Sequence, residues 1–328
     1  MVVNKQKIKF LSNWRRGHSA YDHAARRSRL KGPLSIQIQT VNKCNGSCVM
    51  CPYSCAGPGW EPHQMDESLF RRIIEELKEL GNANLIVMML QNEPLLDPRL
   101  EHRIRLSREI LGNEVEIATV SNGSLLDEKR IESLLSSGLD RIAISIDAYS
   151  RETYGKIRRG LSFERVVDNT IQLVRKGKEK NVPVVVRFLR QSLNLDEEKD
   201  FIRFWRERGA RVSIDSLTNR AGMIKNYDSL RQNKSSLYQK LLHPLLNRMI
   251  TCCPLPFTSM GILSDGRAIL CCHDWEHEEI MGDASRQSLS DIWNGDTINR
   301  HRRLLREKRE KESVICRGCS LSGRFWGS

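Results

Sequence analysis

Three cysteines, Cys44, Cys48 and Cys51, lie within eight residues and are the first place in the chain where chemistry is expected. Their C-x3-C-x2-C spacing follows an alternating apolar run at 35–41. Thiolates at such short spacing bind zinc or an iron–sulfur cluster. Three ligands on a four-ligand centre leave one position open for chemistry, whereas a structural zinc loop would need a distant fourth ligand. A strand leading into the loop places this centre at the carboxyl end of a sheet, where α/β folds keep active sites.

The spacing resembles the cluster loop of the radical S-adenosylmethionine (SAM) superfamily. This resemblance implies a 4Fe–4S cluster held by Cys44, Cys48 and Cys51, with SAM chelating the fourth iron through its amino and carboxylate groups. One position departs from the family pattern, because Met50 stands where an aromatic residue usually precedes the last cysteine. A polarizable thioether can lie against the adenine ring, so we expect Met50 to contact SAM.

Strand and helix patterns alternate after this loop. Near-continuous apolar runs separated by amphipathic helices are typical of buried parallel strands. Eight strand–helix units close a full barrel, whereas the six units found here match the open partial barrel that the resemblance implies. We therefore predict an α/β fold, a partial (β/α)6 TIM barrel with a small C-terminal cysteine-rich auxiliary-cluster domain. The predicted strands are 36–41, 84–90, 115–120, 141–146, 182–188 and 211–215, and the predicted helices are 67–80, 98–111, 126–137, 162–180 and 196–208.

Polar residues follow the predicted strands in an ordered series. Each alone would be a turn or a helix cap, but their recurrence at successive strand ends favours a binding site. The Gln-Asn-Glu-Pro motif at 91–94 resembles the family's Gly-Gly-Glu-Pro-like motif only in its last two positions, so Glu93 is expected to meet the SAM amino group and the glycine roles stay open. Asn122 lies in a turn that resembles the family's Thr-Asn-Gly. By the same resemblance Ser145 meets the SAM ribose or carboxylate, and Arg158 pairs with the carboxylate, as a guanidinium fork suits.

A second group of cysteines lies near the C-terminus. Two apolar runs, 257–263 and 267–270, flank Ser-Asp-Gly and predict a β-hairpin whose second strand ends at Cys271-Cys272. The region resembles the SPASM family of radical SAM C-terminal domains through Cys271-Cys272-His273-Asp274-Trp275, Ser288-Leu-Ser-Asp-Ile-Trp293-Asn294 and Cys316-x2-Cys319.

No cysteine follows Cys319, whereas a full SPASM domain carries more cysteines and two auxiliary clusters. The resemblance therefore implies a shortened form with one auxiliary 4Fe–4S cluster. Adjacent residues on a strand point to opposite faces, so only one cysteine of each doublet, 252/253 and 271/272, is expected to be a ligand. The implied ligands are Cys253, Cys271, Cys316 and Cys319.

Composition sets the wider context. We divide the chain into a basic arm at 1–34, the partial barrel at 35–220, a linker at 221–250 and the auxiliary-cluster domain at 251–328. The net charge is +13, and residues 1–31 hold nine Lys or Arg against one Asp. This arm is expected to be a solvated tail or a helix under the barrel, with an acidic partner or phosphorylated substrate as the alternative.

No apolar run reaches 18 residues, so no membrane span is predicted. A basic N-terminus without a signal-peptide run predicts a cytoplasmic protein. Ten cysteines then indicate metal sites rather than disulfides. Aromatic residues make up only 6% of the chain, and no nucleic-acid motif accompanies them, so a nucleic-acid partner is not expected.

The resemblance also implies a reaction. An electron from an external donor such as flavodoxin or ferredoxin reaches the first cluster and cleaves SAM, and the 5′-deoxyadenosyl radical abstracts hydrogen from a C–H bond. An auxiliary cluster with four cysteine ligands can take the remaining electron. We predict dehydrogenation of a polyhydroxylated small molecule, a sugar or an aminocyclitol, to a ketone. Arg220, after the sixth strand, is expected to contact substrate or screen a cluster, or else to be a solvated loop arginine.

Alternatives remain open at this point. In epimerisation a thiol, Cys272 or Cys55, would return hydrogen to the opposite face of the substrate radical. A peptide maturase would need an external leader-binding protein, because the 43 residues before Cys44 are fewer than a typical leader-binding domain. A non-catalytic metal- or nucleic-acid-binding protein is the third possibility.

Overall fold

The structure is a computed structural model that describes residues 30–56, 60–231 and 253–321, apart from the side chains of residues 55 and 56. Its centre is a nine-stranded sheet in the order β6-β5-β4-β3-β2-β1-β7-β8-β9. The strands are β1 (Ser35–Ile38), β2 (Leu85–Val87), β3 (Glu116–Ser121), β4 (Arg141–Ser145), β5 (Val184–Arg190), β6 (Arg211–Ser216), β7 (Ser259–Ile262), β8 (Arg267–Ile269) and β9 (Ile280–Asp283).

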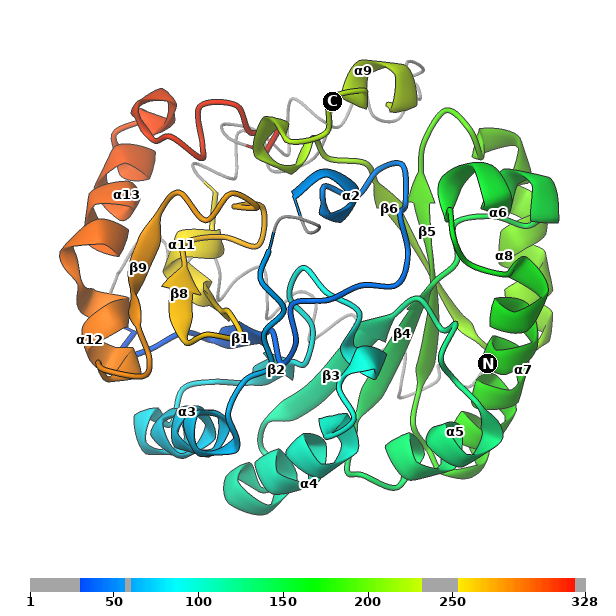
Figure 1. Ribbon diagram of the computed structural model, residues 1–328, viewed down its shortest axis with the longest axis horizontal. Helices are drawn as coiled ribbons and strands as arrows, with labels where there is room; N and C mark the ends of the chain where they lie inside the picture. Colours follow the sequence, from blue (N-terminus) through cyan, green and yellow to red (C-terminus); the bar gives the residue numbers. More distant parts are fainter. Residues whose placement is uncertain (1–29, 57–59, 232–252, 322–328) are drawn as a thin grey trace, which may run out of the picture.

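The first six strands are parallel and adjacent in chain order. Helices on the connections α3, α4, α5, α7 and α8 surround the curved sheet, and the loop after β1 lies inside their ring (Figure 1). The predicted partial barrel is confirmed. The helices are α2 (Tyr53–Ala56), α3 (Glu67–Leu80), α4 (Leu100–Leu111), α5 (Glu128–Leu135), α6 (Arg151–Ile157), α7 (Phe163–Glu179), α8 (Glu198–Glu207), α9 (Tyr227–Leu230), α11 (Leu255–Thr258), α12 (Leu289–Asn294) and α13 (Asp296–Arg306).

Local chemistry sets the helix ends. The Asp127 and Ser162 side chains accept hydrogen bonds from the backbone N–H of Arg130 and Arg165 and so begin α5 and α7. Gly81 ends α3 in the left-handed conformation, with φ of 64°, and donates its N–H to the Leu77 carbonyl. These caps explain why the sequence pattern located the helices to within a few residues.

The C-terminal segment continues the barrel sheet. β7 pairs in parallel with β1, from Ser35 opposite Ser259 to Ile38 opposite Ile262. β8 and β9 then add antiparallel strands, and Gly266 forms the β7–β8 turn with φ of 94°. The predicted hairpin is confirmed, although residues 255–258 form helix α11 and β9 was not predicted.

One detail of the hairpin prediction is wrong. β8 ends at Ile269, so Cys271 and Cys272 follow the strand in a turn and do not alternate across a sheet. The argument that these two thiols must face opposite sides therefore does not apply. Of the proposed domain boundaries, 1–29 of the arm and 232–250 of the linker lie outside the described residues.

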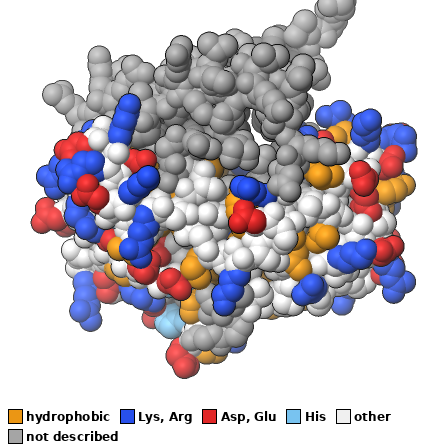
Figure 2. All heavy atoms as spheres, turned by 90° about the horizontal axis from the view of Figure 1, so that it is seen from above, with side chains coloured by type: hydrophobic (Ala, Val, Ile, Leu, Met, Phe, Trp, Pro, Cys, Tyr) orange, Lys and Arg blue, Asp and Glu red, His pale blue; other side chains and the backbone are white. Residues whose placement is uncertain are grey.

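A single apolar core joins barrel and C-terminal segment. Ile36, Val186, Met260 and Trp293 belong to the same cluster of buried side chains. No helix in the described ranges is long and apolar enough to cross a membrane. Over the described part of the face in Figure 2, Lys and Arg side chains are interspersed with Asp and Glu, so the positive net charge is not gathered there into one patch.

Replacing either of two helical glycines by alanine should change the stability of the protein, but in opposite directions. A Cβ on Gly177 in α7 would lie 2.7 Å from the Val182 carbonyl oxygen, whereas one on Gly155 in α6 meets nothing within 4 Å. Gly177→Ala should lower the free energy of unfolding by about 1–3 kcal/mol through overpacking. Gly155→Ala should raise it by about 0.5–1 kcal/mol through helix propensity. Urea titration of both variants checks this, and equal effects of the same sign would contradict it.

Candidate active site

The first cysteine loop rests on the end of helix α6. The Ser47 N–H donates to the Arg159 carbonyl at 3.0 Å, and the Val49 N–H donates to the Ile157 carbonyl at 3.0 Å. Gly160 adopts φ of 81°, and a Cβ there would lie 3.8 Å from the Asn45 carbonyl oxygen. The loop is therefore tied along its length to the segment that follows β4.

Glu93 joins the same loop to the ends of β2 and β3. One carboxylate oxygen accepts from the Ser121 hydroxyl at 2.7 Å and the Leu95 N–H at 3.1 Å, and the other accepts from the Asn122 N–H at 2.7 Å. The Asn122 amide in turn donates to the Asn45 side chain at 2.8 Å. Burial raises the pKa of Glu93, although these three donors act against the rise. The predicted contacts of Glu93 and Asn122 with SAM stay predictions.

The three thiols of the loop lie close together, with Cys48 buried and Cys44 and Cys51 half-buried. Burial raises the pKa of Cys44 to about 12 and that of Cys51 to about 11, and Cys48 adds to both shifts. No three His, Cys, Asp or Glu side chains among the described residues gather closely enough to hold a single metal ion. A 4Fe–4S cluster instead takes each thiolate on a different iron, and three clustered thiols suit three of its four irons.

Arg158 reaches the cysteine loop from the C-terminal end of α6. Its guanidinium pairs with the buried Asp147 carboxylate, with Nε 2.8 Å from Oδ2, and its Nη1 lies 3.6 Å from Cys48 Sγ. Burial alone would lower the pKa of Arg158, but Asp147 and Cys48 outweigh burial and raise it. Asp147 also accepts the Leu189 N–H at 2.8 Å, which fixes it against β5. The pairing of Arg158 with the SAM carboxylate stays a prediction, as this guanidinium is already held by Asp147.

Met50 and Ser145 lie beside these groups. Met50 is 5% exposed and packs with Cys48, Ile157 and Leu217 in a small apolar cluster. Ser145 is the last residue of β4, two positions before Asp147. The contacts of both residues with SAM stay predictions.

The second cysteine group follows β8. The thiols of Cys271 and Cys272 share a hydrogen bond, which together with burial raises the pKa of Cys271, and Cys253 adds to the rise. The His273 N–H points at Cys271 Sγ from 3.4 Å. Both members of the 271/272 doublet therefore face one another, and the choice of Cys271 as the ligand stays a prediction.

The cysteines of the last turn also lie close together. Burial raises the pKa of Cys316, with Cys319 contributing, and the Leu321 N–H lies 3.4 Å from Cys319 Sγ. Backbone N–H groups aimed at Sγ atoms suit thiolate ligands, because they stabilise negative charge on sulfur. The remaining cysteine, Cys252, and the side chain of Cys55 lie outside the described residues.

Gln91 links the two cysteine groups and was not identified from the sequence. It adopts φ of 57°, in the left-handed region, where the resembled motif has glycine. Its amide nitrogen donates to the carbonyls of Asp274 at 2.7 Å and Cys272 at 3.3 Å, and its oxygen lies 2.9 Å from His277 Nε2. These contacts explain why glutamine, rather than glycine, occupies a position with left-handed backbone. In the sequence, the signal for this role was the departure of position 91 from the glycine of the resembled motif.

Aromatic side chains form a second link. The Trp60 ring stacks on His277 and Trp275, at centroid distances of 5.0 and 6.0 Å, and Tyr53 of α2 meets Trp60 edge-on at 5.9 Å. Such pairs add stability beyond the area they bury. The chain that follows the first cysteine loop is thus packed directly against the second.

Several buried polar atoms near the strand ends have no hydrogen-bond partner in the part of the chain that the structure describes. Leaving such atoms unpaired costs about 1–3 kcal/mol each, so we expect them to face bound molecules. Thr40, Asn92 and Gln191 follow β1, β2 and β5, which is the edge where the cofactor is expected. The atoms are Thr40 Oγ1, Asn92 Nδ2, both amide atoms of Gln191, His273 Nδ1 and Trp275 Nε1.

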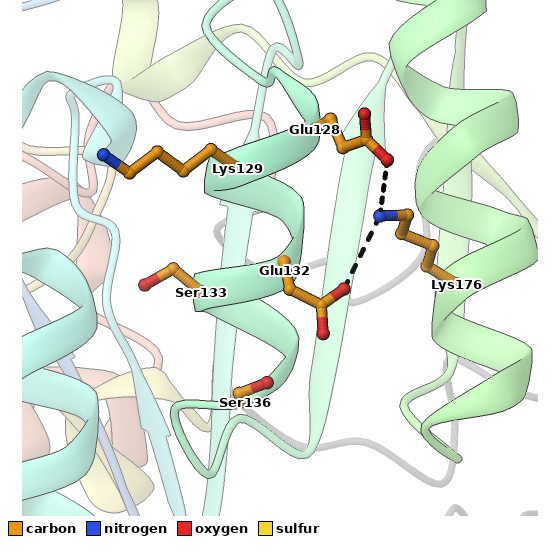
Figure 3. A pocket seen from close by; sticks show the side chains of 6 residues that line it. All are labelled: Glu128, Lys129, Glu132, Ser133, Ser136 and Lys176. Carbon is orange, nitrogen blue, oxygen red and sulfur yellow. Dashed lines mark hydrogen bonds and ion pairs between the residues drawn. The ribbon is translucent and has the colours of Figure 1, made fainter.

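A separate groove lies on the outer surface between α5 and α7 (Figure 3). Lys176 extends across it, with Nζ 3.0 Å from Glu128 and 3.6 Å from Glu132. The acidic groups are exposed and the lysine already has two partners, so the groove offers no catalytic constellation.

Comparison with known proteins identifies the family. The radical SAM superfamily profile matches residues 38–204, and the chain belongs to this superfamily. The profile named SPASM, an iron–sulfur cluster-binding domain, matches residues 252–320. The protein is therefore an iron–sulfur enzyme whose cofactors are SAM, a SAM-binding 4Fe–4S cluster and an auxiliary cluster. The interpretation as a non-catalytic binding protein is wrong.

Two relatives show how far the similarity extends. The S-adenosyl-L-methionine-dependent 2-deoxy-scyllo-inosamine dehydrogenase of Niallia circulans is 24% identical over 285 residues, which cover 87% of this chain and 92% of that protein. The GTP 3′,8-cyclase of Limosilactobacillus fermentum is 28% identical over 180 residues, 54% of this chain and 52% of the cyclase. The similarity to the first relative thus extends over most of both chains, and that to the second over about half of each.

Solved structures share the fold. BtrN in complex with AdoMet and 2-DOIA has a TM-score of 0.60 at 20% identity, covering 87% of this chain and 92% of BtrN. Streptococcus suis SuiB bound to precursor peptide SuiA has a TM-score of 0.68 at 16% identity, covering 99% of this chain and 76% of SuiB. At these identities the likeness supports the architecture alone.

Iron content tests the two cysteine groups. Anaerobically reconstituted protein should hold about eight iron atoms in two four-iron clusters. Replacing Cys44, Cys48 and Cys51 together by Ala should remove about half. Cys271→Ala should also remove about half, whereas Cys272→Ala should retain all of it. Iron assay and absorption spectra of each variant check these outcomes, and full iron content in the triple variant would refute the assignment.

Gln91→Ala tests the link between the groups. It should lower the free energy of unfolding by about 2 kcal/mol, because the carbonyls of Cys272 and Asp274 lose their donor. Gln91→Gly loses the same bonds but relieves about 1 kcal/mol of left-handed strain, so its effect should be smaller. Urea titration of the reconstituted proteins measures both. An alanine variant as stable as the parent would show that the link contributes nothing.

Proposed function

We propose that this enzyme is a radical SAM dehydrogenase that oxidises a secondary alcohol of a polyhydroxylated small molecule, a sugar or an aminocyclitol, to a ketone. The main support is the second all-cysteine group, joined by Gln91 and by the β1–β7 pairing to the loop that holds the first. A relative that this chain spans over 92% of its length is named as a dehydrogenase of 2-deoxy-scyllo-inosamine.

The oxidation removes one hydrogen atom from the carbinol carbon, one proton from its hydroxyl oxygen and one electron from the radical that results. When bound, SAM and the two clusters supply hydrogen-atom abstraction from a C–H bond and an acceptor for the remaining electron. The chain's own part is to hold the reacting groups and exclude water. The network of Glu93, Asn122 and Asn45 fixes the first loop, and the packed rings of Trp60 and Trp275 close the space beside it.

The first cluster requires an electron from outside the chain. We propose a flavodoxin or a ferredoxin as this donor. The net charge of +13 favours an acidic electron carrier, because opposite charges speed association. The rate at which purified flavodoxin or ferredoxin reduces the enzyme should fall as salt is added, since electrostatic steering weakens as ionic strength grows.

The product decides between dehydrogenation and epimerisation. Reconstituted enzyme with SAM, a reductant and a polyol in deuterium oxide should form a ketone and an equal amount of 5′-deoxyadenosine, with no deuterium at an inverted carbon. Mass spectrometry and NMR of the product measure this. Instead, one solvent deuterium at an inverted carbon, lost in Cys272→Ala or Cys55→Ala, would establish epimerisation with a thiol donor.

A further inference from the structure

The segment at 217–224, which follows β6, packs against the first cysteine loop. Leu217 and Ile224 belong to the same buried apolar cluster as Cys48 and Met50. The segment includes a 3-10 turn, Arg220–Gly222, four residues after β6 ends at Ser216. It therefore forms part of the wall around the SAM-side cysteines.

The same segment is bound to the second cysteine group. The Asn219 amide donates to the Gly318 carbonyl at 2.6 Å, and its oxygen accepts the Ser320 N–H at 2.8 Å. The Asn219 N–H donates to the Ser320 hydroxyl at 3.1 Å. Gly318 lies inside the Cys316-x2-Cys319 loop, so residues 217–224 bridge the two cysteine groups.

The backbone at the bridge is strained. Arg220 and Ala221 have φ of 50° and 58°, in the left-handed region, and Gly222 has φ of 94°. Left-handed backbone costs an L-residue about 1–2 kcal/mol, and such strain persists where surrounding contacts determine the conformation, often at ligand sites. The contacts of Asn219 and Leu217 supply this constraint on either side of Arg220.

The acidic side chains around the two cysteine groups already have hydrogen-bond partners, so Arg220 is left to bind another anion. Glu93 and Asp147 are occupied by the donors described above, and Asp274 accepts the backbone N–H groups of Glu278 and Glu279 at 3.0 and 3.2 Å. Within the described ranges Arg220 forms no ion pair, unlike Arg158 at the end of α6 and two arginines of β5. Those pairs are Arg158–Asp147, Arg187–Asp215 and Arg190–Glu198.

The contacts on either side place Arg220 between the two cysteine loops, because Leu217 packs with Cys48 and Asn219 binds Gly318. His273 follows the Cys271–Cys272 doublet and is 6% exposed, and its Nδ1 has no hydrogen-bond partner among the described residues, so a polar group of the second cysteine group is also unused.

We propose that Arg220 binds an oxyanion group of the substrate, a carboxylate or a phosphate ester, at the bridge between the two cysteine groups. This inference rests on the proposed function and narrows its substrate class to an anionic polyol rather than an amine. A guanidinium suits a carboxylate or phosphate because it donates two parallel hydrogen bonds. An ammonium group would be repelled by the positive charge of Arg220. The carboxylates of Glu93, Asp147 and Asp274 could not offset this repulsion, because they already bind other donors.

Binding of matched polyols tests the proposal. The probes are myo-inositol, myo-inositol 1-phosphate, glucose, glucuronate and scyllo-inosamine, titrated calorimetrically into reconstituted enzyme with SAM. The phosphate or the carboxylate should bind about tenfold more tightly than its neutral counterpart, as one charge-assisted contact supplies. Arg220→Gln should abolish this difference and Arg220→Lys should keep part of it. Arg203→Gln, an exposed arginine of α8 paired with Asp200, is the matched control and should keep it fully.

The other outcomes contradict either this inference or the proposed function. If scyllo-inosamine binds as tightly as either anion, the inference is wrong. The affinities of the parent enzyme decide this point even if Arg220→Gln loses its clusters. Weaker SAM binding in Arg220→Gln without polyol, with the anion preference kept, would assign Arg220 to SAM instead. Ketone formation from neutral polyols without anion preference overturns this inference alone. Binding of none of the probes overturns the proposed function as well.

Discussion

The parallel pairing of β7 with β1 is the contact on which this architecture depends. A six-stranded partial barrel has two open edges, and an open edge exposes unpaired backbone groups. Here β7 covers the β1 edge and continues into β8 and β9. The loop after β1 carries the first cysteines and the turn after β8 carries Cys271, so this pairing places two groups distant in sequence on nearby strands of one sheet, and Gln91 joins them.

Three buried acidic side chains near the two cysteine groups hold the surrounding segments in place. Glu93 holds the β2 and β3 ends together, Asp147 holds Arg158 and β5, and Asp274 shapes the turn after Cys272. Fully satisfied polar networks rigidify what they join. A radical reaction gains from this rigidity, because the reacting atoms must stay aligned and shielded from water. Among the described residues these acids already have partners while Arg220 has no ion pair, which is why we assign Arg220 a role in binding.

Gln91 shows how a departure from a family motif can carry information. A glycine at this position would satisfy the left-handed backbone without strain. Glutamine accepts that strain and reaches the turn of Cys272 and Asp274, while His277 and Trp275 contact Trp60 beyond the first loop. The two cysteine groups are therefore joined by hydrogen bonds and by ring stacking as well as by the sheet.

The sequence by itself determined the strand–helix alternation, the partial barrel, the family and the cysteine groups, because these depend on local apolar periodicity, turn residues and short ligand spacing. It also located Glu93 and Asn122 directly after the second and third strands, whereas Arg158 ends helix α6. Only the tertiary structure decided which partners these side chains have, that β8 stops before Cys271, and that Gln91 and Asn219 bridge the two groups. Those contacts join residues about 100 to 180 positions apart, and a periodic pattern carries no information on pairs so distant in the chain.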